Sequence, residues 1–198
     1  MTRRLFIAVE PPPPVRRRLA AIQAEMKRLA GRNADDVRWV GADNLHVTLQ
    51  FLGSVPEERV EDVKAALAGA AAEIAPLHLE LRGAGAFPHG RKPRVLWAGL
   101  SGDVDRLTAL AASIGNALAP LGFTPEDRPF SPHVTLGRSR EPRGAPRLAA
   151  AIAGTANVSG PGWRVVEVDL VQSHLSPTGA RYETIARAAL GASLLPGG

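Results

Sequence analysis

The tetrapeptide His-Val-Thr-Leu occurs twice in this chain of 198 residues, first at His46 and again at His133, 133 − 46 = 87 positions later. The chain contains only five histidines, so two of them in an identical context form an unusual pattern. An imidazole has a reference pKa of about 6.5, so near neutral pH one can be neutral while another is protonated. Two imidazoles across a cleft suit a reaction that takes one proton and gives another, which is general acid and base catalysis.

Strand alternation places each histidine beside a threonine. In a regular strand, His46 and Thr48 share one face of "LHVTLQFL", and Phe51 falls with the apolar residues on the other face. His133 and Thr135 share a face in the same way. If two halves of the chain face each other, hydroxyls and backbone amides could hold an anionic centre between the imidazoles. A phosphodiester fits this geometry, with one histidine activating water and the other protonating the leaving oxygen.

Two other interpretations of the histidines have to be weighed. A single histidine on a strand is usually structural, but the identical context in two matching segments makes that account weaker. Imidazole is also a common metal ligand. The chain has no cysteine, and neither motif places a carboxylate or a second histidine at ligand spacing, so we expect no metal and no cofactor.

The predicted elements divide the chain into two related parts, each with one motif on a strand between helices. "RLFIAVE" predicts a buried strand that "PPPP" ends, and an apolar stripe from Val15 to Leu29 predicts a helix. Ser54 and Glu57 have the spacing of a capping box before a second helix. Further helices are expected at 104–121 and 146–153, and "WRVVEVDLV" and "ARYETIARA" as one strand each.

These patterns predict an α+β fold that is bilobal. Alternating, half-polar strands favour mostly antiparallel sheets with outer helices over parallel βαβ winding. The repeated unit predicts two pseudo-symmetric halves around a central cleft. The expected organisation is a single bilobal domain over residues 1–198, with residues 193–198 as a flexible tail.

Composition narrows the class of protein. Hydrophobic residues make up 45% and charged residues 22%, which argues against disorder. The formal net charge is +5, which favours phosphate-bearing partners. The first apolar run, "LFIAV", is too short for a signal peptide, so we expect a cytoplasmic protein without a membrane partner.

The motifs resemble those of a known family. "HVTLQFLG" and "PHVTLGR" are similar to the two H-x-T-x motifs of the two-histidine phosphoesterase superfamily, and in particular of the bacterial RNA 2′,3′-cyclic phosphodiesterases, also called 2′-5′ RNA ligases. The similarity extends along most of the chain, through "RLFIAVE", "PRVLWAGL", "FSPHVTLGR" and "LVQSHLSPTGARYE".

The resemblance implies metal-independent hydrolysis of a terminal 2′,3′-cyclic phosphate on RNA to a 2′-phosphomonoester, and the reverse joining of RNA halves through a 2′-5′ bond. It implies that His46 donates a proton to the departing 3′ oxygen, that His133 accepts one from water, and that Thr48 and Thr135 contact the phosphate. RNA with a cyclic phosphate terminus is the expected partner, tRNA fragments being one candidate. The expected state is a monomer.

Four further residues are candidates for substrate binding. Arg138 lies five residues after His133 and would point to the opposite face of a regular strand, so it is either a surface residue or a phosphate ligand. Phe130 is either a base-stacking residue or part of the core. Arg91 and Lys92 belong to the basic loop "HGRKPR", which is a candidate for contacts with the RNA backbone or a solvated loop.

Two other functions remain open at this stage. A module that binds an AMP-like nucleotide without turnover would use the same cleft. A cyclic phosphodiesterase could also act on small nucleotides in place of RNA.

Overall fold

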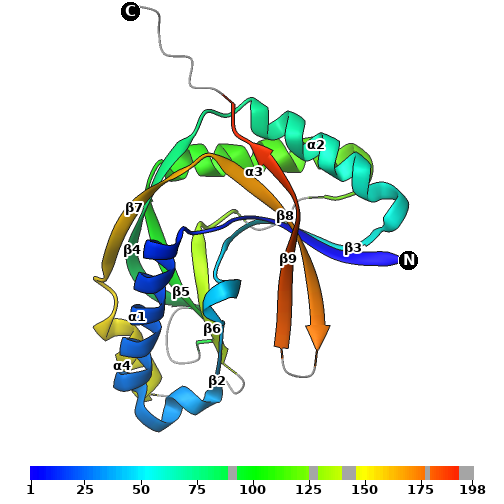
Figure 1. Ribbon diagram of the computed structural model, residues 1–198. Helices are drawn as coiled ribbons and strands as arrows, with labels where there is room; N and C mark the ends of the chain where they lie inside the picture. The colour runs from blue at the N-terminus through cyan, green and yellow to red at the C-terminus, as the bar shows by residue number, and fades with distance from the viewer. Residues whose placement is uncertain (89–92, 125–128, 140–145, 177–178, 192–198) are drawn as a thin grey trace, which may run out of the picture.

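A sheet of nine strands runs through the molecule and carries four α-helices on its outer side (Figure 1). The computed structural model describes residues 1–88, 93–124, 129–139, 146–176 and 179–191, and these counts refer to that part of the chain. The strands are β1 (Thr2–Val9), β2 (Val37–Trp39), β3 (Val47–Pro56), β4 (Leu77–Phe87), β5 (Val95–Gly102), β6 (His133–Ser139), β7 (Ser159–Val165), β8 (Glu167–Ser176) and β9 (Gly179–Ala189). The helices are α1 (Pro13–Ala30), α2 (Val60–Ala72), α3 (Val104–Leu118) and α4 (Pro146–Gly154).

The sheet consists of two halves that meet at the two motif strands. The strand order is β7-β4-β5-β6-β3-β1-β8-β9, with β2 paired to β6. We call β3, β1, β8 and β9 the first half-sheet, and β6, β5, β4 and β7 the second half-sheet. Pairing in both is antiparallel, which confirms the expected sheet type and excludes the parallel βαβ option. The halves are joined by the antiparallel pairing of β3 with β6 at Val47 and Val134.

The helices lie on the outside of the sheet in two pairs. Helix α1 contacts α4 and β7, and α2 contacts α3 and β9 (Figure 1). Helix α1 connects β1 to the strands that follow it, yet it packs against the second half-sheet. The chain therefore links the two halves through helix packing as well as through the sheet.

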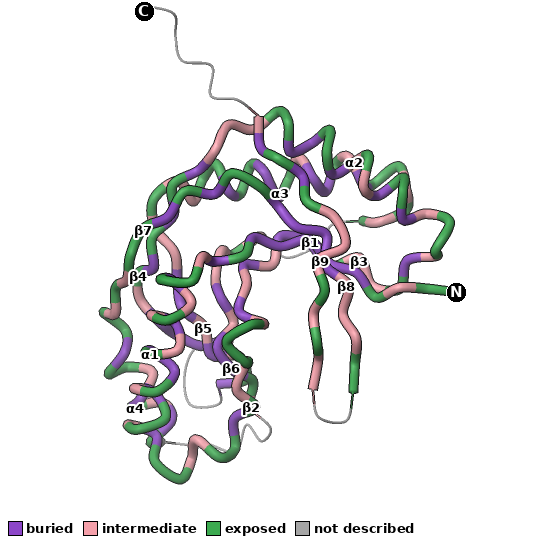
Figure 2. Tube along the Cα trace, in the orientation of Figure 1, coloured by how far each residue is buried: buried purple, intermediate pink, exposed green. Residues whose placement is uncertain are grey.

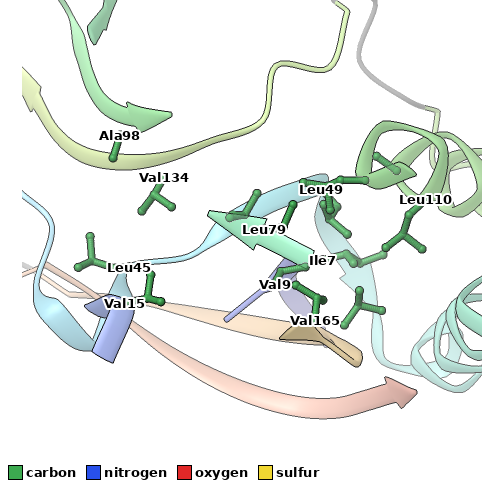
Figure 3. Packing of buried hydrophobic residues seen from close by; sticks show 14 of the residues in the cluster. Ile7, Val9, Val15, Leu45, Leu49, Leu79, Ala98, Leu110, Val134 and Val165 are labelled. Atoms are coloured by element: carbon green, nitrogen blue, oxygen red, sulfur yellow. The ribbon is translucent and has the colours of Figure 1, made fainter. Parts of the chain in front are cut away.

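The apolar stripe of α1 explains how this helix packs. Val15, Leu19, Ile22 and Met26 are buried, as the sequence pattern predicts, and they join one core cluster with the outer side of the sheet. Prolines open the helix, where the missing amide hydrogens cost nothing. Figure 2 shows that buried residues concentrate between helices and sheet, and Figure 3 shows the packed side chains, Val134 and Leu45 among them.

Two local predictions are wrong. Ser54 does not cap α2, because it still belongs to β3, and a 3₁₀ turn at Glu57–Arg59 leads into the helix without a side-chain cap. "WRVVEVDLV" forms two strands, β7 and β8, that separate at Val166 and lie in different halves of the sheet. The sequence favours β-structure on both sides of this break, so the sequence pattern does not predict it.

Both motif strands contain a bulge at the leucine of His-Val-Thr-Leu. In β3, Thr48 pairs with Ala8 and Gln50 pairs with Ile7, so Leu49 is the extra residue. A bulge inserts one residue into a strand and reverses the alternation of side chains beyond it.

The second half-sheet has a bulge at the equivalent position. In β6, Thr135 pairs with Trp97 and Gly137 pairs with Leu96, so Leu136 is the extra residue. The two halves thus share both a motif and its irregularity.

The bulges change which residues lie beside the histidines. On β1, Phe6 and Ala8 are two residues apart and therefore share a face. Phe6 pairs with Phe51 and Ala8 pairs with Thr48, so Phe51 and Thr48 also share a face. Arg138 pairs with Val95, two residues from the Trp97 that pairs with Thr135. The prediction that Phe51 lies on the apolar face is therefore wrong, because it assumed a regular strand. Arg138, which only a regular strand would place on the opposite face, lies on the face of Thr135.

A buried glutamine supports the second bulge. The Nε2 amide of Gln23 on α1 donates hydrogen bonds to the carbonyl oxygens of Leu136 at 2.8 Å and Val40 at 2.9 Å. One amide group thus binds the extra residue of β6 and the residue that follows β2.

Replacing Gln23 with leucine should destabilise the protein by about 2 kcal/mol, because two buried carbonyls lose a donor. Chemical denaturation should show this as a lower free energy of unfolding. Arg17→Gln, an exposed change on the same helix, serves as the control. A Gln23→Leu protein as stable as the parent would show that the bulge does not depend on this amide.

Candidate active site

Four side chains from the two motifs meet where the half-sheets join. In an antiparallel pair, the residues that flank a bridge face one another. The pairing of Val47 with Val134 therefore sets His46 across from Thr135 and Thr48 across from His133. We call these four residues the His/Thr quartet. The two histidines are diagonal neighbours, which in regular pairing lie about 7–8 Å apart. A single tetrahedral phosphate fits between two imidazoles at that separation.

The backbone holds both imidazoles in the same way. The Nδ1 atom of His46 lies 2.7 Å from the carbonyl oxygen of Asn44, and that of His133 lies 2.7 Å from the carbonyl oxygen of Ser131. A carbonyl only accepts, so each Nδ1 carries the hydrogen and donates it. This leaves Nε2 of each ring as the nitrogen that takes up or releases a proton. Equivalent bonds in both halves set equivalent tautomers.

Aromatic rings pack against the imidazoles, and the sequence analysis missed them. Phe6 lies 4.8 Å from His46 between ring centroids, and Tyr182 lies 5.3 Å from it, edge to face. Phe87 lies 5.4 Å from His133, also edge to face. Tyr182 is half-buried beside the site. In "RLFIAVE" every central residue is apolar, so alternation gives no sign that Phe6 faces the histidines.

Burial and neighbouring charge both act on the imidazoles. Burial lowers the pKa of His46, and the positive charges of His133 and Arg138 lower this pKa further, against the Asn44 carbonyl and Glu10, which raise it. Burial also lowers the pKa of His133, and Arg138 adds to this effect. Burial and charge together therefore favour the neutral form of each imidazole. Arg138 lies close enough to act on both rings.

The remaining predicted residues lie in different surroundings. Phe130 is half-buried and packs against the core cluster. Arg91 and Lys92 lie outside the described residues, as does the tail at 193–198. Trp39 packs against the core cluster and donates from Nε1 to the Ala34 carbonyl oxygen at 3.1 Å.

Metal-binding clusters and membrane-spanning helices are both missing from the part of the chain that the structure describes. Within these ranges, no three or more His, Asp or Glu side chains gather in a way that could hold a metal ion. None of the helices described is long and apolar enough to cross a membrane.

The fold and the site together define a class. Two antiparallel half-sheets that present two His-x-Thr motifs on one face are the arrangement of a two-histidine phosphoesterase. Residues 11–177 match the model of the 2′-5′ RNA ligase superfamily. The chain belongs to that superfamily.

Individual relatives agree with this assignment. The RNA 2′,3′-cyclic phosphodiesterase of Methanothermobacter thermautotrophicus is 34% identical over 90% of this chain and 94% of its own length. The crystal structure of TT0787 of Thermus thermophilus matches with a TM-score of 0.78 and 30% identity over 96% of this chain and 99% of that one. Escherichia coli LigT complexed with 3′-AMP matches with a TM-score of 0.70 and 26% identity over 96% and 99%. LigT complexes with NADP+ and ATP also match this chain.

Replacing Arg138 with glutamine should raise the pKa of both imidazoles, because a positive charge that disfavours their protonation is removed. The measurement is an NMR titration of the histidine ring protons, which needs no substrate. Arg106→Gln, on α3, is the matched control and should leave both midpoints in place. Unchanged midpoints for His46 and His133 in the Arg138 variant would contradict the placement of Arg138 beside them.

Proposed function

We propose that this protein hydrolyses the 2′,3′-cyclic phosphate at RNA ends to a 2′-phosphomonoester, with one imidazole as general acid and the other as general base. The observation that carries the proposal is the diagonal arrangement of His46 and His133, each with Nδ1 held by a backbone carbonyl. Both Nε2 atoms are then available to one phosphate. The names of the relatives supply the substrate class.

In this mechanism, the oxygen of a water molecule attacks the phosphorus, and His133 takes a proton from that water. The bond between phosphorus and the 3′ oxygen breaks, and His46 donates its proton to that oxygen. The electron pair of the broken bond stays on the 3′ oxygen, and the phosphate remains on the 2′ oxygen. With an RNA 5′-hydroxyl in place of water, the same two proton transfers form a 2′-5′ bond. No step requires a metal ion or another cofactor.

The charges around the histidines support this assignment of roles. Glu10 favours the protonated form of His46, whereas the charge that acts on His133 is the positive charge of Arg138. Burial favours the neutral form of both imidazoles. An anionic phosphate between them supplies the negative charge that favours protonation of one ring. Substrate binding and proton uptake by the acid are thus coupled.

The other candidate residues have separate roles in the proposal. Thr48 and Thr135 complete the quartet and donate hydroxyl hydrogen bonds to phosphate oxygens. Arg138, on the same face after the bulge, adds a charge-assisted bond. Arg91 and Lys92 contribute to attraction of the RNA backbone, which is a charge effect that salt weakens. We propose that the protein acts as a monomer in the cytoplasm.

A second function also has some support. The LigT complexes with 3′-AMP, NADP+ and ATP show that a related protein binds nucleotides. Binding without turnover, or turnover of small cyclic nucleotides, would use the same quartet.

Replacing either His46 or His133 with alanine should lower kcat on a cyclic-phosphate oligonucleotide by about 10²–10⁴-fold, because each removes one proton transfer. His174→Ala is the control, since Nε2 of His174 on β8 forms a hydrogen bond of 2.9 Å with Oε2 of Glu183 on β9. The assay contains a chelator, and activity of the parent should persist. Full activity of either quartet variant would exclude the proposed roles. Calorimetric binding of AMP without hydrolysis by the parent would favour the binding module.

The pH dependence of kcat/KM should be bell-shaped, with its maximum below the usual imidazole pKa of about 6.5. Activity falls on the acid side as His133 is protonated and on the alkaline side as His46 is deprotonated. Burial lowers both pKa values, so both limbs move to lower pH. In Arg138→Gln both limbs should move to higher pH. A maximum well above neutrality in the parent would contradict this account.

A further inference from the structure

Arg38 on β2 lies directly across from Arg138 on β6. The two residues are partners in the antiparallel pairing of these strands, and both are exposed. Val37 and Trp39, the neighbours of Arg38 on β2, pack with the core cluster. Strand alternation therefore turns Arg38 to the opposite side, the quartet face, where Arg138 also lies. We call these two residues the arginine pair.

The arginine pair forms the next row of side chains beside the quartet. On β5, Trp97 pairs with Thr135 and Val95 pairs with Arg138. Because these β5 residues are two positions apart, the arginine pair lies about 7 Å along the sheet from the row of His46 and Thr135. The pair is thus adjacent to the phosphate position and outside the quartet.

The arginine pair lacks negative charge nearby. In the part of the chain that the structure describes, neither guanidinium forms an ion pair or a hydrogen bond. Arg3, Arg59 and Arg187, by contrast, each form an ion pair with a carboxylate. Like charges directly opposite each other in a sheet are destabilising. A bound anion would offset this repulsion, and phosphate oxygens accept charge-assisted hydrogen bonds from arginine.

The guanidinium of Arg38 extends from β2 toward the first half-sheet. A Cβ atom on Gly179, at the start of β9, would lie 3.9 Å from Nη2 of Arg38. Beside it, Asn44 Nδ2 donates a hydrogen bond of 2.7 Å to the carbonyl oxygen of Ala180. The carbonyl oxygen of the same Asn44 accepts from His46. The position of Arg38 relative to the imidazole is therefore set by contacts at both ends of this short segment.

We propose that the arginine pair is a second phosphate subsite, in which Arg38 binds the phosphodiester on the 5′ side of the terminal nucleotide while the cyclic phosphate lies in the quartet. This inference rests on the proposed function and specifies its substrate class, a cyclic phosphate at the end of an RNA chain. A free nucleoside 2′,3′-cyclic phosphate has one anionic group, which the quartet takes up. An RNA end has a second anionic group on the 5′ oxygen of the same ribose, and this group matches Arg38.

Calorimetry with two stable ligands tests the subsite without turnover. Adenosine 2′,5′-bisphosphate has a phosphate at both positions, and adenosine 2′-monophosphate lacks the 5′-phosphate. The parent should bind the bisphosphate more tightly. In Arg38→Gln this preference should fall about tenfold, because charge-assisted bonds to one phosphate are lost. Arg38→Lys keeps the charge without the planar fork, so its preference should lie between those of the parent and Arg38→Gln.

A kinetic test uses substrates that differ only in the 5′ phosphodiester, namely adenosine 2′,3′-cyclic phosphate and its 5′-(methyl phosphate). In Arg38→Gln, the ratio of kcat/KM for the methyl phosphate to that for the unmodified substrate should fall about tenfold, mainly through KM. Arg4→Gln is the matched control and should keep the ratio of the parent. Arg4 is exposed on the quartet face, two residues from Phe6 on β1, and its replacement changes the net charge equally.

The outcomes separate this inference from the proposed function. A parent that hydrolyses neither substrate, together with the expected calorimetric loss in Arg38→Gln, would contradict the proposed function and leave the subsite in place. An unchanged preference in Arg38→Gln would overturn the subsite. Equal losses on both calorimetric ligands would also overturn it, because Arg38 would then act on the whole site. The same fall in Arg4→Gln would reveal a general effect of charge and would overturn it too.

Discussion

The pairing of Val47 with Val134 is the constraint on which the site depends. Both valines are fully buried, and the two half-sheets join through them. The register at this pair sets each histidine across from the threonine of the other motif. A slip of one strand by one residue would turn the apolar residues of that strand to the quartet face and its imidazole into the core. Two segments far apart in the chain thus form one site because a buried apolar pair fixes their alignment.

The bulges extend the site beyond the four residues that strand alternation supplies. An extra leucine in each motif strand turns the following residues over, so Phe51 and Arg138 come to the quartet face. The bulge in β6 is close to β2, where Gly137 leaves room, since a Cβ there would come within 2.6 Å of Val37 Cγ1. Gln23 binds the carbonyl of the extra residue. The irregularity is therefore built into the packing of α1 and β2.

The regular part of this structure was open to prediction from sequence, and the irregular part was not. A period of two in His-Val-Thr-Leu placed each histidine with its threonine, and helical spacing placed the buried stripe of α1. The position of a bulge follows no such period, because it depends on which residue of the neighbouring strand each backbone group forms a hydrogen bond with. The aromatic neighbours were hidden for another reason. Phe6 lies in a strand that is apolar on both faces, and Tyr182 reaches His46 only through the pairing of β8 with β1.

The symmetry of the two halves makes the two histidines alike, and the charges around them make them different. Equivalent backbone bonds give them the same tautomer, and burial lowers the pKa of both, yet acid and base catalysis needs one protonated and one neutral ring. The difference in charge comes from Glu10, which raises the pKa of His46 alone, whereas Arg138 lowers the pKa of both rings. Phe51 gives the first half-sheet a ring where the second has that arginine. A duplicated framework thus supplies equivalent geometry in both halves, and the differences between the halves supply the asymmetry on which the proposed proton transfer depends.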